Sequence, residues 1–463
     1  MLFNSAQFAI FLLVVAGIHP LLPRDWRNTW LLVTSIVFYS LWLPIYLLLF
    51  LGVLLVNYLF AVRIAQGGAP KRPLVASIVF TLSVLAYFKY RNFFFENVAW
   101  LWGGVPPGAE LFLPLGISFY SFVIIALNVD IYRGAMSLPR FDRYVLFVMF
   151  FPHLIAGPIL RGYEFLPQLE QGGVYTRERI RRGLWLIAGG LFKKVVMGDF
   201  LLAPFVNEVF RLPGDASAPV HLVAMYSLAF QIYCDFSGYS DMARGIACLL
   251  GYELPLNFAE PYLSRNPAEF WRRWHMTLSR WLRDYLYIPL GGNRKGSART
   301  SINLMLTMLL GGLWHGASWN FLIWGGLHGL LLVVHRWFRG GDAETPLRFA
   351  LGDVLAITAT FHAVCVLWIF FRAADFATAS TILGTIVGGD WRGEIPLLQI
   401  AIVLACMAAH VAERLVVDRS ERIVVATRES WGFAAVEGVA FGVILALSVL
   451  CNGTGTSFIY FQF

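Results

Sequence analysis

Long stretches without a charged residue dominate the pattern of hydrophobic and polar positions along this chain. A transmembrane helix needs about 20 apolar residues to cross a hydrocarbon core about 30 Å thick. The charge-free stretches cover residues 1–23, 28–62, 73–88, 111–129, 144–160, 216–234, 300–335, 354–371, 376–389, 395–412 and 438–463. This pattern predicts an all-α, multi-pass membrane protein.

Two of these stretches are too long for one crossing. As single helices, 28–62 and 300–335 would each extend about 50 Å. We expect Pro44 to break the first and Gly311-Gly312 to break the second, which gives roughly 11 to 13 membrane segments, some of them re-entrant. The first stretch has no basic residue before it and no small-residue cleavage site after it, so we expect an uncleaved span.

Composition excludes a water-soluble fold. Of the 463 residues, 58% are hydrophobic and 14% are charged, whereas about 25% are charged in an ordinary soluble domain. The five cysteines have no CxxC spacing, so we expect buried free thiols and neither a disulfide framework nor a metal site. The net charge of +8 is interpreted as contact with an anionic lipid leaflet and not with nucleic acid.

Much of the positive charge lies in one loop, 264–299. It holds eight basic and two acidic residues, a net charge of +6, and such loops favour the cytoplasmic side. Asn266 as N-cap, Pro267 in the first turn and Glu269 three residues after the cap predict a helix over 267–288.

This predicted helix is amphipathic. Its large apolar side chains fall on one face: Trp271, Trp274, Leu278, Trp281, Leu282 and Tyr285. Its basic side chains fall on the other: Arg272, Arg273, Arg280 and Arg283. We expect the helix to lie in the membrane interface. His275 projects at the edge of the tryptophan face, either as a functional group turned toward the membrane interior or as an interfacial histidine bonded to a carbonyl.

The most prominent polar residue at predicted membrane depth is His315, next to Trp314 and midway through the 300–335 stretch. Polar residues at this depth are costly and often functional. Burial disfavours an imidazolium, so we expect a neutral His315 able to accept a proton. The alternative is a core histidine that bonds a neighbouring helix; for His328 and His335, packing is the preferred interpretation.

A second polar cluster closes the 216–234 stretch and contains Asp235, Ser237 and Asp241. The two carboxylates are six residues apart and do not form an acid–base pair on one helix face. Asp241 and Arg244 have the i, i+3 spacing of an ion pair. The other interpretation is a polar lining for a substrate tunnel, to which Trp314 would also contribute.

Several of these motifs together resemble one family. The sequences FWRRWH (270–275), LRDYLYI (282–288), LGGNR (290–294) and LGGLWHGA (310–317) are similar to the signature of the membrane-bound O-acyltransferases (MBOATs). FSGYSDMA (236–243) and FPHLIAGP (151–158) resemble the bacterial branch that acetylates alginate, other polysaccharides and peptidoglycan. Motifs for phosphate-loop, Rossmann, zincin and nucleophile-elbow chemistry are absent from the sequence.

The resemblance implies a fold and a site. It implies one integral-membrane domain over 1–463, with a motif-bearing core at about 111–372 and helices in a ring around a central tunnel. It implies that His315 is the catalytic base and that His275 is its companion, which polarises the carbonyl or orients the thioester. The basic face listed above would attract the phosphates of the acyl donor at the cytoplasmic mouth.

The implied function is O-acetylation of a secreted or cell-wall polysaccharide at the bacterial cytoplasmic membrane. Acetyl-CoA, as substrate and not as bound cofactor, would supply the acetyl group, and a secreted or periplasmic acetyltransferase would pass it on to the polymer. One alternative keeps the fold and transfers D-alanine from a carrier protein to teichoic acid. Another, from a different class, is a transporter or channel without chemistry.

Overall fold

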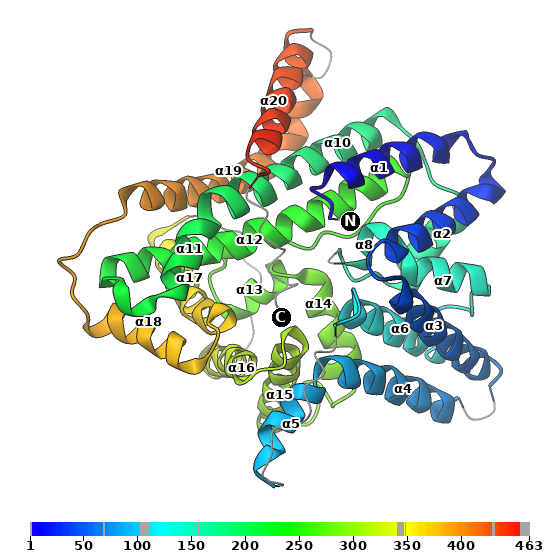
Figure 1. Cartoon of the computed structure of the whole chain (residues 1–463), viewed down its shortest axis with the longest axis horizontal. Coiled ribbons are helices and arrows are strands. Elements are labelled where there is room, and N and C mark those ends of the chain that lie inside the picture. The colour runs from blue at the N-terminus through cyan, green and yellow to red at the C-terminus, as the bar shows by residue number, and fades with distance from the viewer. Residues whose placement is uncertain are drawn as a thin grey trace. The chain divides into compact units, whose positions relative to one another are not determined.

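The computed structural model describes residues 2–67, 70–101, 112–155, 157–339, 347, 349–427 and 431–453, and within those ranges its regular elements are all helices (Figure 1). The contacts divide the chain into two compact units. The first consists of Met1–Ile187 with Tyr239–Pro255, and the second of Ala188–Gly238 with Leu256–Phe463. The prediction of an all-α membrane fold is confirmed.

The first unit is built from the N-terminal helices. They are α1 (Ala6–Ile18), α2 (Arg24–Ser40), α3 (Pro44–Ala65), α4 (Lys71–Lys89), α5 (Arg91–Val98), α6 (Ile117–Tyr132), α7 (Phe141–Met149), α8 (Phe151–Leu154), α9 (Gly162–Gln171) and most of α10 (Arg177–Leu191). Helices α3, α4 and α6 pack against one another, and α2 packs against α7. The predicted break at Pro44 is confirmed, because α3 begins there with proline in its first turn.

A buried polar network connects α3, α4 and α6. The Asn57 side-chain oxygen accepts hydrogen bonds from the hydroxyls of Ser77 at 2.7 Å and Thr81 at 3.1 Å. The Asn128 amide donates to the Ser77 hydroxyl at 2.8 Å. Hydrogen bonds of this kind hold helices together where lipid offers no competing partner.

The second unit contains the later helices. They are α11 (Ala203–Arg211), the start of α12 (Ala218–Leu249), α13 (Pro267–Arg273), α14 (Met276–Leu282), α15 (Ser297–His315), α16 (Trp319–Arg339), α17 (Leu351–Arg372), α18 (Phe376–Gly388), α19 (Leu397–Thr427) and α20 (Trp431–Leu450). Two π-helical segments, Phe192–Leu202 and Arg283–Tyr287, adjoin α11 and α14. Helix α16 packs against α13, α15 and α17.

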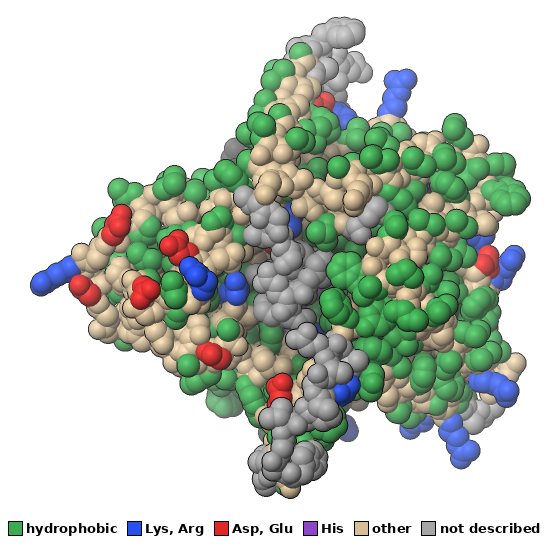
Figure 2. Space-filling view, viewed as in Figure 1, with side chains coloured by type: hydrophobic (Ala, Val, Ile, Leu, Met, Phe, Trp, Pro, Cys, Tyr) green, Lys and Arg blue, Asp and Glu red, His purple; other side chains and the backbone are tan. Residues whose placement is uncertain are grey.

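Within the described residues, five helices are long and apolar enough to cross a membrane: those at Pro44–Ala65, Lys71–Lys89, Trp319–Phe338, Leu351–Arg372 and Leu397–Leu415. Four shorter apolar helices cover Ala6–Leu21, Ile117–Tyr132, Phe376–Gly388 and Ala435–Leu450. Large hydrophobic side chains are widely exposed on these helices, and the face drawn in Figure 2 is rich in them. The protein is therefore a multi-pass membrane protein.

The predicted break at Gly311-Gly312 is wrong. Both glycines lie inside α15, and the chain turns after His315, before α16 starts at Trp319. A side chain at Gly312 would collide with the backbone oxygen of Phe321, so this glycine permits close packing of α15 on α16 and does not end the helix.

Candidate active site

A break in the backbone at Trp274 and His275 shapes the centre of the candidate site. Trp274 is extended, His275 has a left-handed backbone with φ 42°, and α14 begins at Met276. The prediction of one helix over 267–288 is therefore wrong. The apolar residues follow a similar helical periodicity before and after this two-residue break. The periodicity alone therefore does not reveal the break.

An extended segment holds the two sides of this break. The Met276 N–H donates to the Asn257 carbonyl at 2.9 Å, and the Ala259 N–H donates to the Arg273 carbonyl at 3.0 Å. These bonds compensate for a left-handed conformation that is unfavourable for a residue with a side chain. The break turns His275 inward, and its side chain is 0% exposed.

The Asn257 side chain determines which nitrogen of His275 carries the proton. The Asn257 Oδ1 atom accepts from the Thr277 N–H at 3.2 Å, which identifies it as the oxygen of the amide, and from the Thr277 hydroxyl at 2.9 Å. The Nδ1 atom of His275 lies 3.2 Å from the same oxygen. Since an amide oxygen only accepts, Nδ1 must be the donor, and the neutral ring has its free lone pair on Nε2.

The Nε2 atom of His275 is buried and makes no hydrogen bond to any residue that the structure describes. The edge of Phe236 lies against the ring, with centroids 4.6 Å apart, and the Trp314 ring lies at 6.3 Å. Burial lowers the pKa of His275 to about 3. A neutral imidazole with a bare acceptor nitrogen is therefore held in an apolar environment, ready to accept a hydrogen bond from a ligand.

His315 is the last residue of α15, and its side chain is 5% exposed. Its ring lies 4.9 Å from Trp314, 5.1 Å from Trp324 and 5.4 Å from Phe371, centroid to centroid, each in an edge-to-face arrangement. Trp314 thus contacts both candidate histidines. The structure brings together two buried imidazoles that are 40 residues apart in the sequence.

An ion-pair cluster covers the start of α13. The Asn266 side chain accepts from the Glu269 N–H at 2.7 Å, which confirms the predicted N-cap. The Glu269 carboxylate pairs with Arg265 at 3.2 Å and with Arg273 at 3.0 Å. Arg273 also pairs with Glu260 at 3.5 Å. Arg273, predicted as a donor contact, thus takes part in this ion-pair cluster.

The other basic residues of the segment lie nearer the surface. Arg272 and Arg283 are exposed and Arg280 is half-buried. The Arg283 guanidinium pairs with the adjacent Asp284 at 2.7 Å. Arg283 and Tyr287 also line a cavity of about 210 Å³.

Apart from Arg283 and Tyr287, this cavity is bounded mainly by apolar side chains of α13 to α16, among them Trp271, Leu282, Met308 and Leu332. Trp271 also contacts the Trp324 ring, with centroids 5.9 Å apart, and Trp324 in turn contacts His315. A charged rim and an apolar interior suit an elongated ligand with an anionic end.

The predicted tunnel-lining residues differ in their contacts: Asp235 and Asp241 form ion pairs, and Ser237 does not. Asp235 is buried and lies 2.6 Å from the Lys194 ammonium, which also pairs with Asp199 at 2.8 Å. Ser237 is buried, and its hydroxyl has no hydrogen-bond partner among the described residues. Asp241 pairs with Arg244 at 3.3 Å, as its i, i+3 spacing suggested.

Two residues of importance were not identified from the sequence. Asn257 has no distinguishing pattern around it, since its role depends on a contact with a residue 18 positions later. Lys194 follows Lys193 in an otherwise apolar helical stretch, and a lysine at such a position is the signal that would have indicated a buried partner. Within the described residues, no group of three or more metal-binding side chains occurs.

Comparison with known families identifies the chain. The model of the membrane-bound O-acyltransferase family matches residues 31–374. The chain belongs to this family. The matched region includes both candidate histidines, Asn257 and the Asp235 cluster.

Similar MBOAT relatives extend over most of the chain. A probable alginate O-acetylase, AlgI, of Pseudomonas putida is 39% identical over 87% of this chain and 85% of its own length. A peptidoglycan O-acetyltransferase of Helicobacter pylori is 39% identical over 82% of this chain and 76% of its own. A teichoic acid D-alanyltransferase of Streptococcus thermophilus is 30% identical over 49% of this chain and 57% of its own. The chain is thus an O-acyltransferase of the polysaccharide O-acetylating branch. The alternative of a transporter or channel that catalyses no reaction is therefore not retained.

Proposed function

We propose that this MBOAT transfers an acetyl group from cytosolic acetyl-CoA, across the bacterial cytoplasmic membrane, for O-acetylation of a secreted or cell-wall polysaccharide. The observation that carries the proposal is the pair of buried histidines, His275 and His315, whose rings both lie near Trp314. Support for acetyl over D-alanyl transfer comes from the acetyltransferase relatives, which match more of the chain at higher identity.

In the proposed reaction, His315 is the general base. Its imidazole takes the proton from the acceptor hydroxyl while the hydroxyl oxygen attacks the thioester carbonyl carbon. The carbon–sulfur bond then breaks, CoA leaves as a thiolate, and the proton returns from His315 to the sulfur. The products are an acetyl ester and free CoA.

Of the two roles expected for His275 from the sequence, we propose orientation of a reactant. Polarising a carbonyl requires an N–H directed at its oxygen, whereas the hydrogen bond to Asn257 leaves a bare Nε2 on the neutral ring. We therefore assign His275 to orienting a reactant, by accepting a hydrogen bond from its O–H or N–H group. Trp314, which lies near both histidines, would separate this reactant from lipid.

The donor would enter beside α14 and the start of α15. Arg283 supplies the positive charge in the lining of the cavity of about 210 Å³. The apolar walls of this cavity suit the narrow pantetheine arm of CoA. Arg272 and Arg280 would add attraction for the phosphates from outside the cavity.

The proposal includes a partner acetyltransferase outside the membrane. The connections between the described helices are short, so a polymer-binding cleft is difficult to place on this chain. The acetyl group would instead pass to a serine of a secreted protein, which finishes the transfer to the polymer.

Reconstitution in liposomes tests the proposed function. Acetyl-CoA is enclosed inside, and alginate or peptidoglycan fragments are supplied outside, with and without a secreted acetyltransferase from the same organism. We expect CoA release inside and acetylated polymer outside only with the partner present. Polymer acetylation without a second protein would refute the partner, and turnover of a D-alanyl carrier but not of acetyl-CoA would refute the proposed donor.

A further inference from the structure

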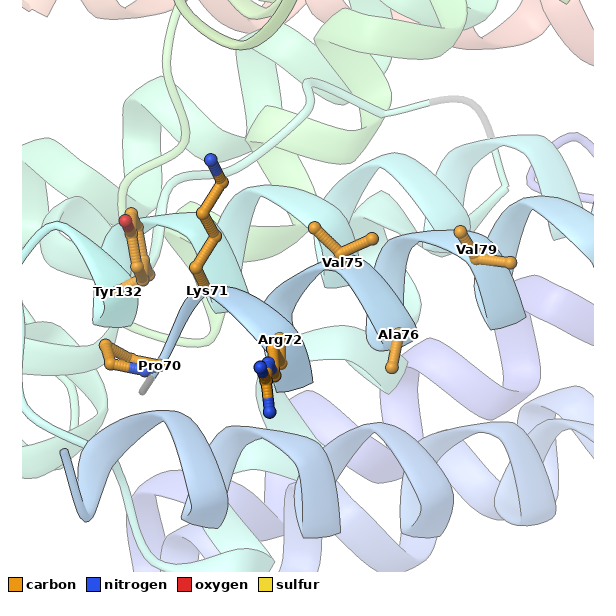
Figure 3. Close-up of a pocket in the computed structure, with 7 residues that line it drawn as sticks. All are labelled: Pro70, Lys71, Arg72, Val75, Ala76, Val79 and Tyr132. Carbon is orange, nitrogen blue, oxygen red and sulfur yellow. The ribbon is translucent and has the colours of Figure 1, made fainter. Parts of the chain in front are cut away.

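A second cavity lies in the first unit, remote in sequence from the candidate active-site residues. Its volume is about 660 Å³, and it is lined by the start of α4 and the end of α6: Pro70, Lys71, Arg72, Val75, Ala76, Val79 and Tyr132. Figure 3 shows Lys71, Tyr132, Val75 and Val79 extending in the same direction, while Arg72 and Ala76 extend to the other side of α4. The cavity therefore has a cationic end and an apolar wall.

The apolar wall belongs to a helix that can cross the membrane. Helix α4 is one of the five long apolar helices, and most of its surface is not covered by the protein. Val75 and Val79 are 49% and 57% exposed. From Lys71 to Val79 the helix rises about 12 Å, at about 1.5 Å per residue, which is most of the hydrocarbon depth of one leaflet, about 15 Å.

The cationic end lacks an acidic neighbour in the cavity wall: none of the described residues that line the cavity is acidic. Neither Lys71 nor Arg72 forms an ion pair with any residue that the structure describes, and both are exposed. Tyr132, at the end of α6, is 39% exposed, and tyrosine at the end of a membrane helix is typical of the headgroup level.

We propose that this cavity binds one anionic phospholipid, with its phosphate at Lys71 and Arg72 and an acyl chain along Val75, Ala76 and Val79. The combination of features selects this occupant. A soluble anion would make no use of the apolar wall, and a zwitterionic lipid would leave the two cations uncompensated. An anionic lipid of a cytoplasmic leaflet matches both parts of the cavity, because its headgroup is attracted to the cationic end and its acyl chain covers the apolar wall.

Native mass spectrometry of the full-length protein, released from nanodiscs of known composition, tests this site. Phosphatidylglycerol and phosphatidylcholine with identical acyl chains are compared as probes. We expect one phosphatidylglycerol to remain bound selectively. Lys71→Ala and Arg72→Ala should each lower its retention about five-fold, since one basic residue near the surface contributes about 1 kcal/mol.

Two further variants separate the charged end from the apolar wall. Val75→Trp fills the cavity without changing its charge and should also lower retention. Leu82→Trp, on the same helix at a 43% exposed position outside the cavity, is its control. Arg63→Ala, at the end of α3, is the control for loss of one charge. Equal retention of the two lipids, or unchanged phosphatidylglycerol binding in Lys71→Ala/Arg72→Ala or in Val75→Trp, would overturn the proposal.

Discussion

The side-chain oxygen of Asn257 lies 3.2 Å from Nδ1 of His275, while the Thr277 N–H and hydroxyl donate to the same oxygen. This relationship fixes the protonated nitrogen of a fully buried histidine. It also directs the free lone pair of that ring into the apolar environment near Trp314. The chemistry of His275 is therefore set by a residue that does not itself approach the substrate in our proposal.

Asn257→Asp should change the pH dependence of turnover. Burial lowers the pKa of wild-type His275 to about 3, so this ring stays neutral between pH 5 and 8. Its protonation therefore causes no decline of the turnover rate in that range. A carboxylate at position 257 stabilises the imidazolium and raises the pKa of His275, by about 1 to 3 units for such neighbours. Turnover should then decline as the pH falls toward the raised pKa.

Steady-state rates of acetyl-CoA turnover between pH 5 and 8 measure this effect. Thr277→Ser retains the hydroxyl bond to Asn257 and serves as the control, with a profile like that of the wild type. A purely structural role of Asn257 predicts a uniform loss of activity in Asn257→Asp, with no new dependence on pH.

His275→Ala should lower kcat by about 10²-fold, because the reactant loses the hydrogen bond that orients it for attack. His275→Gln keeps a polar group of similar size and should recover part of the rate, since its side chain can also accept a hydrogen bond. kcat and KM for acetyl-CoA, measured separately, decide the outcome. A rise in KM with kcat unchanged would restrict His275 to donor binding.

Glu269→Gln should destabilise the second unit by about 1 to 3 kcal/mol, because it leaves the half-buried guanidinium groups of Arg265 and Arg273 with their longer ion pairs, to Asp353 and Glu260 at 3.5 Å each. Burial opposes ionisation of Glu269, but the Arg265 N–H and the Arg273 and Arg265 guanidinium groups outweigh it and hold its pKa below the ordinary value. This stabilisation is complete above the ordinary pKa near 4.5 and is lost as the pH falls through the lower folded value.

Thermal unfolding in detergent between pH 3 and 7 measures this prediction. The Tm of the wild type should decline at the acid end more than that of Glu269→Gln. Glu253→Gln is the control, since Glu253 is 51% exposed in its pair with Arg179 and should contribute little. Equal acid sensitivity of the wild type and Glu269→Gln would exclude the proposed contribution.

The segment 264–299 should face the cytoplasm. Ser297 is exposed at the start of α15, so Ser297→Cys in a variant without native cysteines provides a single accessible thiol. In intact cells it should be protected from a membrane-impermeant thiol reagent and should react after the membrane is permeabilised. Ready labelling in intact cells would place the donor side on the opposite face.

Features that depend on local sequence could be predicted well. The break at Pro44 and the N-cap at Asn266 follow from the chemistry of proline and asparagine at helix starts, and both are present. Charge-free stretches identified the membrane helices because lipid imposes the same requirement on every span. The i, i+3 pair of Asp241 and Arg244 is local as well.

Features that depend on contacts distant in sequence could not be predicted. Gly312 was expected to break a helix, but its function is decided by the approach of Phe321 from the next helix. The break at His275 is held by hydrogen bonds from residues 257 and 259. The pair of Arg273 with Glu260 could not be predicted either, because Glu260 lies outside the amphipathic segment.

The most direct test of the account is acetyl-CoA turnover by purified His315→Ala in liposomes that are supplied with the partner acetyltransferase and polymer outside, compared with the wild type under the same conditions. His362→Ala, which removes an exposed histidine of α17, is the matched control. We predict that His315→Ala inserts and unfolds like the wild type but releases no CoA above background, while His362→Ala retains the wild-type rate. Near-normal turnover by a well-folded His315→Ala would contradict the claim that His315 is the catalytic base.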